Sequence, residues 1–122
     1  MKKILVAAAM VVVSSVSLAQ EISKDMWIAQ MKTALPQHFC SAEKYFRQCF
    51  NVQESQCKMV AADATDACLK QYEGKIPSIL KQPVDGAHWG TQVGMCAGNA
   101  YDVALIKQRI NTPKCNNPKN WQ

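Results

Sequence analysis

The spacing of apolar side chains along the chain predicts a protein that is helical almost throughout. A first helix is expected to begin after Ser23, a residue type that caps helix N-termini, and to stop or kink at Pro36, which lacks a backbone N–H. Its inner face, at helical spacing, would be Trp27, Met31 and either Ala34 or Leu35. A second helix is expected over residues 37–50. Its apolar stripe would be Phe39, Ala42, Phe46, Cys49 and Phe50.

A third helix is predicted from a capping pattern and a long apolar stripe. Asn51 is a polar residue suited to an N-cap, and Glu54 follows it three places later. The helix is expected to run to Tyr72, with Gly74 standing where a C-terminal cap belongs. Its inner stripe would be Cys57, Val60, Ala61, Ala64, Cys68 and Tyr72.

A fourth helix is expected after a connector over residues 75–85, in which Pro77 and Pro83 oppose regular structure. Asp85 can cap it, and the helix would extend from Gly86 to about Lys107. Its inner face would be Trp89, Val93, Cys96, Ala100 and either Val103 or Ala104. Proline and asparagine after that point predict an irregular tail.

The predicted fold class is all-α. No stretch alternates apolar and polar residues beside a hairpin turn, so strands have little support. No internal segment is rich enough in Gly and Ser to separate two domains. We therefore expect residues 20–122 to form one small disulfide-stapled bundle of about four helices, with a Cys-linked antiparallel helical hairpin and an irregular C-terminal tail.

The first 19 residues have the layout of a secretory signal peptide. Lys2 and Lys3 precede an apolar run over residues 4–13, and small residues lead to Ala19. The run is about half as long as the roughly 20 residues that span a membrane, and no second long apolar run follows. We expect cleavage after Ala19, no transmembrane segment, and a periplasmic or secreted location in a bacterium.

The charge pattern argues against nucleic acid as a partner. The chain has 14 Lys and Arg against 9 Asp and Glu, a net charge of +5 that falls to +3 when Lys2 and Lys3 leave with the signal peptide. These charges are scattered and form no basic block. A solvated surface is the simplest interpretation.

Six cysteines in a short exported chain predict three disulfides. If the second and third helices formed an antiparallel hairpin, two nested bridges would staple it, one near the turn and one at the open end. The third bridge would tie the tail to the fourth helix, which must then end near Lys107 to leave enough chain for the return. The expected pairs are Cys40–Cys68, Cys49–Cys57 and Cys96–Cys115.

The cysteine spacing over residues 40–68 resembles the twin-cysteine hairpins of mitochondrial import substrates. The resemblance implies a stapled helical hairpin and no activity. No Cys-x-x-Cys motif occurs, and the chain has two histidines. We therefore expect neither a metal site nor a cofactor.

Four of the five glycines recur at an interval of four residues, at Gly86, Gly90, Gly94 and Gly98. Glycine inside a helix costs about 1 kcal/mol relative to alanine, so four of them need a compensating reason. Close approach of another helix is the favoured interpretation, with the alanine-rich third helix as the neighbour. A groove for a partner or ligand beside the stripe is the alternative.

Catalytic chemistry has little support in the sequence. No serine lies in a Gly-x-Ser-x-Gly elbow, and His38 and His88 are the two imidazoles available as bases. Aromatic residues give better evidence for a binding function, because Trp and Tyr are enriched at binding hot spots. The candidate binding residues are Trp89, Gly90, Gly94, Gly98 and Tyr101, and Trp121 ends a tail that nothing requires to be apolar.

These observations favour an exported helical binding module whose partner is another protein, such as an inhibitor, an immunity-type protector or a secretion accessory. Two alternatives remain open at this point. One is a small secreted enzyme or effector that uses His88 or His38. The other is a periplasmic chaperone that uses adaptable methionine- and alanine-rich surfaces.

Overall fold

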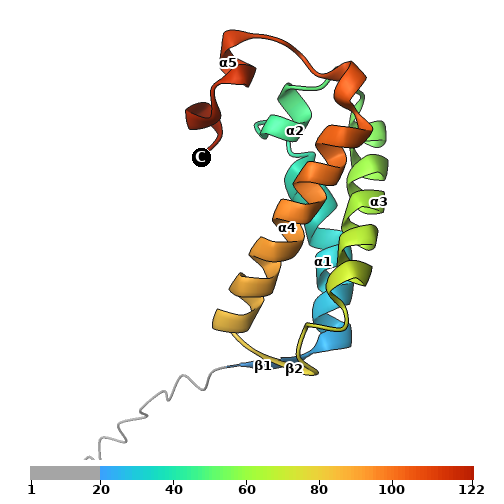
Figure 1. The fold of residues 1–122 in the computed structure, drawn as a ribbon, viewed down its shortest axis with the longest axis vertical. Helices are drawn as coiled ribbons and strands as arrows, with labels where there is room; N and C mark the ends of the chain where they lie inside the picture. The colour runs from blue at the N-terminus through green and yellow to red at the C-terminus, as the bar shows by residue number, and fades with distance from the viewer. Residues whose placement is uncertain (1–19) are drawn as a thin grey trace, which may run out of the picture.

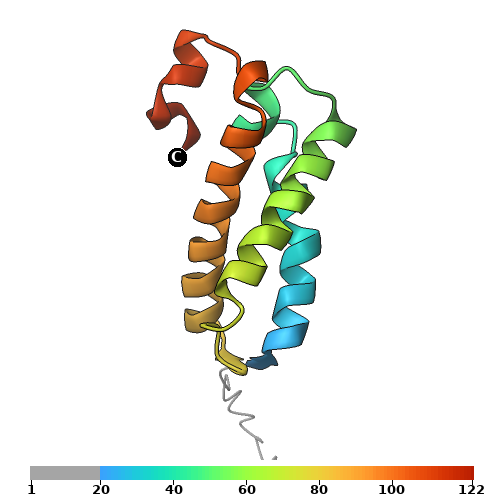
Figure 2. The same ribbon diagram turned by 45° about the vertical axis from the view of Figure 1, so that its right-hand side comes forward.

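Three long helices form the body of the protein (Figures 1 and 2). The structure, a computed structural model, describes residues 20–122, so the predicted signal peptide at 1–19 lies outside the described residues. Helix α3 (Glu54–Tyr72) packs along both α1 (Lys24–Phe39) and α4 (Val84–Ala104), which contact each other far less. The predicted all-α, disulfide-stapled fold class is confirmed.

A short antiparallel ribbon closes the end of the bundle near the N-terminus of α1 (Figure 1). Strand β1 (Glu21–Ser23) pairs with β2 (Ile79–Lys81), and Ile22 lies opposite Leu80, which is completely buried. The low support for strands was wrong here. Three residues are too few for an alternating pattern to show in the sequence.

The first predicted helix begins where expected and ends later. The Ser23 hydroxyl accepts a hydrogen bond from the Met26 amide at 3.3 Å, which confirms the N-cap. Pro36 does not stop the helix, because the buried proline ring packs in the core and the Cys40 amide still donates to the Pro36 carbonyl. The predicted helix over 37–50 is wrong. A turn follows Cys40 instead, and α2 is a single helical turn (Tyr45–Gln48).

Helix α3 ends at Tyr72 as predicted but begins two residues later than the expected Asn51 cap implies, and both caps differ. Gln53 is the N-cap residue and makes no side-chain cap. The expected cap, Asn51, instead donates a hydrogen bond from its backbone N–H to the Gln108 carbonyl at 2.8 Å. Gly74 has no positive φ, so it is not a left-handed C-terminal cap.

Helix α4 begins at Val84, before the expected cap residue. Asp85 lies inside its first turn, where its carboxylate accepts a hydrogen bond from the Lys81 amide at 2.7 Å. The helix ends at Ala104, close to the end that the sequence required. Beyond it, the tail predicted to be irregular carries η1 (Ile106–Gln108), α5 (Pro113–Asn116) and η2 (Pro118–Trp121).

An aromatic cluster fills the core at the end of the bundle where α2 lies. Tyr101 of α4 is completely buried, with ring centroids 5.0 Å from Phe46 and 5.1 Å from Phe50. Its hydroxyl donates a hydrogen bond to the Phe46 carbonyl at 2.8 Å. Burial raises the pKa of Tyr101 to about 12, which keeps this donor protonated.

The six cysteines all form disulfides, but with different partners from those expected. The bonds are Cys40–Cys57, Cys49–Cys115 and Cys68–Cys96. The expected pairs 40–68, 49–57 and 96–115 are therefore wrong. The first two relied on a helix over 37–50 that does not form, and the third was the pair that remained. The end of α1 lies beside the start of α3, which brings Cys40 to Cys57. Farther along, α3 faces α4, which brings Cys68 to Cys96.

Peptide mapping of the non-reduced protein should link the Cys40 and Cys57 peptides, the Cys49 and Cys115 peptides, and the Cys68 and Cys96 peptides. The bonds span 17, 66 and 28 residues. Loss of any one should lower the free energy of unfolding by about 3–4 kcal/mol, through the greater freedom of the unfolded chain. A Cys49–Cys57 linkage in the map would contradict this arrangement.

Candidate functional site

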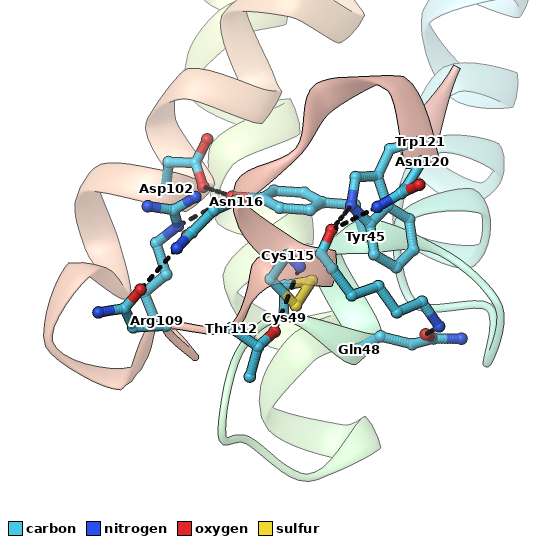
Figure 3. Close-up of a disulfide and its surroundings, with 12 residues drawn as sticks. Tyr45, Gln48, Cys49, Asp102, Arg109, Thr112, Cys115, Asn116, Asn120 and Trp121 are labelled. Carbon is cyan, nitrogen blue, oxygen red and sulfur yellow. Dashed lines mark hydrogen bonds between the residues drawn. A yellow bond between two sulfur atoms is a disulfide. The ribbon is translucent and has the colours of Figure 1, made fainter.

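The C-terminal tail folds back beside α2 and the last turns of α4 and leaves a cavity of about 250 Å³. We call it the tail cavity. Its walls come from α2, the last turns of α4, the chain after η1, and both short helices of the tail (Figure 3). It is lined by Tyr45, Asp102, Arg109, Cys115, Asn116, Pro118 and Trp121.

Backbone pairing and one disulfide fix the tail at this position. Phe50 and Arg109 form an isolated antiparallel bridge, and the Ile110 amide donates to the Cys49 carbonyl at 2.8 Å. The Cys49–Cys115 bond then joins the segment before α3 to α5 (Figure 3). Two chain segments far apart in sequence are therefore held together on both sides of the cavity.

The tail is also organised by its own hydrogen bonds. Thr112 caps α5 by accepting from the Cys115 amide at 3.2 Å. The Trp121 indole N–H donates to the Lys114 carbonyl at 3.1 Å, and the Lys114 ammonium donates to Gln48 of α2 at 2.9 Å (Figure 3). These bonds hold the Trp121 ring 5.7 Å from the ring of Tyr45, edge to face. The last aromatic residue of the chain is thus a wall of the cavity.

The Tyr45 hydroxyl bridges an acidic and a basic side chain within the tail cavity. Its hydroxyl donates to the Asp102 carboxylate at 3.4 Å and accepts from Arg109 Nε at 3.2 Å (Figure 3). Asp102 and Arg109 do not pair directly, since the ion pairs of residues 20–122 are Lys32–Asp66 and Lys58–Glu54. Burial raises the pKa of Asp102, and the hydrogen bond from Tyr45 and the charge of Arg109 offset this only in part.

The sequence pointed to Trp121 and Cys115 of this cavity but not to Tyr45, Asp102 or Arg109. Tyr45 lies 57 residues from Asp102 and 64 from Arg109, so no local motif connects them. The signal that could have pointed here is the tail itself. A tryptophan and a cysteine in an otherwise polar C-terminal segment indicate that the segment returns to the core.

The candidate binding residues of α4 do not form one exposed surface. Tyr101 and Gly98 are buried, so the structure removes both from an external binding face. Trp89 is half-buried, 6.1 Å from the ring of Tyr72 on α3. Gly90 and Gly94 are also half-buried.

Close helix packing at the glycines is found at one end of the stripe only. A Cβ at Gly98 would lie 3.1 Å from Phe46 Cζ, whereas a Cβ at Gly94 would meet no atom of another element within 4 Å. The expectation that a neighbouring helix touches Gly94 is therefore wrong. Helix α3 does pack along α4, but α4 meets the core through Val93, Ala97 and Tyr101, which are completely buried, and Gly94 lies off this face.

The two histidines lie at opposite ends of the bundle. His38 is in the last turn of α1, and His88 is near the start of α4, against the Trp89 ring. Both are exposed. Within residues 20–122, no group of three or more His, Cys, Asp or Glu side chains could hold a metal ion. Likewise, no described helix is long and apolar enough to cross a membrane.

We expect the Asp102 carboxyl to titrate above its ordinary pKa of 3.8. Because the folded pKa exceeds the unfolded one, the contribution of this group to stability falls as the pH rises from about 3.8 through the folded pKa. Carboxyl ¹³C NMR against pH measures the midpoint. In the wild type the hydrogen bond from Tyr45 stabilises the ionised carboxylate. Tyr45→Phe removes this bond, so the midpoint should rise further. A midpoint below 3.8, or a fall in the variant, would contradict this electrostatic account.

Two glycine variants test the packing of α4. Gly94→Ala should raise the free energy of unfolding by up to about 1 kcal/mol, because alanine is the better helix former and the space is open. Gly98→Ala should lower it, because the stacked rings of Phe39 and Phe46 leave little freedom for Phe46 to move away. Denaturant unfolding of both variants is the measurement, and the account fails if Gly94→Ala is the less stable of the two.

Comparison with known proteins adds a family to this geometry. A family model described as "T2SS substrate NttA", where T2SS denotes the type II secretion system, matches residues 21–109. No curated protein and no solved structure matches the chain. The matched region runs from β1 to Arg109, so α5 and η2 of the tail lie beyond it. Substrates of a secretion system leave the cell, which agrees with three disulfides. The chain belongs to the T2SS substrate NttA family of secreted proteins.

Proposed function

We propose that this protein is a binding module that recognises another protein outside the bacterial cytoplasm, and that recognition takes place at the tail cavity. The size of the cavity is the observation that carries the proposal. At about 250 Å³ it is smaller than the roughly 300–1,000 Å³ of small-molecule sites. It suits one projecting group of a larger partner rather than a whole cofactor.

The fixed position of the cavity walls supports this role. The Cys49–Cys115 disulfide and the pairing of Phe50 with Arg109 hold the walls before any partner arrives. A site that is already ordered loses less conformational entropy on binding, which favours affinity. Aromatic side chains and arginine, the residue types enriched at binding hot spots, line the cavity as Tyr45, Trp121 and Arg109.

The export route belongs to the same proposal. Residues 1–19 would act as a signal peptide that is removed after Ala19, so that the secreted chain begins at Gln20. Disulfides would then form outside the cytoplasm, where the redox conditions permit them. If the chain folds before it is released from the cell, the tail cavity is already formed in the secreted protein.

The half-buried face of α4 at Trp89, Gly90 and Gly94 is a second candidate surface for the partner. Its support is the open space beside Gly94, which leaves room for a side chain of another molecule. The tail cavity is the stronger candidate, because it combines concave shape, aromatic walls and both signs of charge.

Site-specific photocrosslinking separates the two surfaces. A benzoylphenylalanine placed at Asn116, an exposed wall of the tail cavity, should crosslink a protein from the extracellular fraction. The same group at Asp63, an exposed residue of α3 that does not line the cavity, should not crosslink that protein. The protein is taken from culture medium, and mass spectrometry should read its first residue as Gln20. Crosslinking from Thr91 of α4 alone, or equally from Asn116 and Asp63, would contradict recognition at the tail cavity.

A further inference from the structure

The hydrogen-bonding groups of the tail cavity are incompletely used, and those left free define a ligand. The Tyr45 hydroxyl is occupied in both directions, because its one hydrogen goes to Asp102 and it accepts from Arg109. The Asp102 carboxylate has a second oxygen, and the Arg109 guanidinium has terminal N–H groups, that bond to no protein group among the described residues. An acceptor-only group and a donor-only group thus lie on either side of the Tyr45 hydroxyl, each with hydrogen-bonding capacity left over.

The opposite charges of these two groups favour a neutral ligand, because a ligand with a single charge of either sign is attracted by one group and repelled by the other. Asp102 repels a carboxylate or phosphate, and Arg109 repels an ammonium or guanidinium. The two groups lie on either side of the Tyr45 hydroxyl, so their opposite charges partly offset each other without a direct ion pair. The group that satisfies both is neutral, with a donor and an acceptor side by side.

Adjacent hydroxyls on a sugar ring have this property, because each hydroxyl both donates and accepts. One hydroxyl would donate to Asp102, and its neighbour would accept from Arg109. The C–H bonds on the face of such a ring carry partial positive charge and pack well on the electron-rich faces of aromatic rings. Tyr45 and Trp121 supply such rings in the wall of the cavity.

We infer that the tail cavity binds a neutral sugar ring through a pair of adjacent hydroxyls, held between Asp102 and Arg109 and packed against Trp121. The inference rests on the tail cavity being the binding site of the protein. The cavity volume of about 250 Å³ suits a single ring. The ring is either a free saccharide or the terminal residue of a glycan on the partner protein.

NMR titration of the ¹⁵N-labelled, disulfide-bonded protein tests the inference. The probes are the methyl glycosides of glucose, galactose and mannose, with N-acetylglycinamide and sodium acetate as an amide and an anion of similar size. At least one glycoside should shift the Trp121 indole and Arg109 Nε signals in a saturable way and leave the indoles of Trp27 and Trp89 unmoved. No glycoside response, a response spread over all three indoles, or stronger binding of the amide or acetate would overturn the inference.

Variants keep the test independent of folding. Asp102→Asn preserves shape and should weaken glycoside binding by about 10- to 100-fold, the value of one hydrogen bond to a charged group. Arg109→Lys, which keeps the charge but loses the forked donor, should also weaken it. The matched control Asp25→Asn, at an exposed position on α1, should bind as the wild type does. Equal binding by Asp102→Asn and wild type, with unchanged spectra elsewhere, would contradict the assignment.

Two further comparisons distinguish a free saccharide from a glycan on the partner, and a failure of the sugar inference from a failure of the proposed function. If the ring belongs to a glycan on the partner, enzymatic deglycosylation of the extracellular fraction should abolish crosslinking from Asn116. If the ring is a free saccharide, excess methyl glycoside should shift the Trp121 indole while deglycosylation changes nothing. Crosslinking from Asn116 without any glycoside response would leave protein recognition standing and refute the sugar. Glycoside binding without a crosslinked protein would support the sugar site and refute protein recognition at the tail cavity.

Discussion

The buried ring of Tyr101 is the constraint on which one end of the molecule depends. It lies among Phe39 of α1, Phe46 of α2 and Phe50, so a single side chain of α4 joins three separate parts of the chain. Its hydroxyl would be costly to bury alone, and the Phe46 carbonyl removes that cost by accepting its hydrogen. Because this bond is made to backbone, it fixes the position of α2 as well as its side chain. A helix of one turn could not hold its place by its own hydrogen bonds.

The tail cavity follows from the placement of α2. Once Phe46 is fixed to the core, Tyr45 beside it is directed toward the tail, where it meets Trp121. The tail in turn is held by Cys49–Cys115 and by the pairing of Phe50 with Arg109. Asp102 lies one residue beyond Tyr101 on α4, so the residue that anchors the core and the residue that faces the cavity are neighbours. Structure and candidate site therefore share one set of contacts.

The parts of the fold that were predictable are those set by local periodicity. The Ser23 cap and the extent of α3 to Tyr72 follow from residue types and helical spacing within one segment. The disulfide partners were not predictable, because they depend on which helices are neighbours. The turn after Cys40 replaced an expected helix, and every pairing inferred from that helix changed with it. The triad of Tyr45, Asp102 and Arg109 was hidden for the same reason, since long-range packing alone brings the three together.

The account as a whole requires that the C-terminal tail be as well ordered as the helices. Backbone and Trp121 indole ¹⁵N relaxation measures this most directly. The account predicts order parameters for α5, η2 and the Trp121 indole near the value of about 0.85 typical of a rigid backbone, and a marked fall in the tail when Cys49 and Cys115 are both replaced by serine. Order parameters below about 0.6 for the tail of the disulfide-bonded protein would mean that the tail cavity does not persist, and would contradict the account.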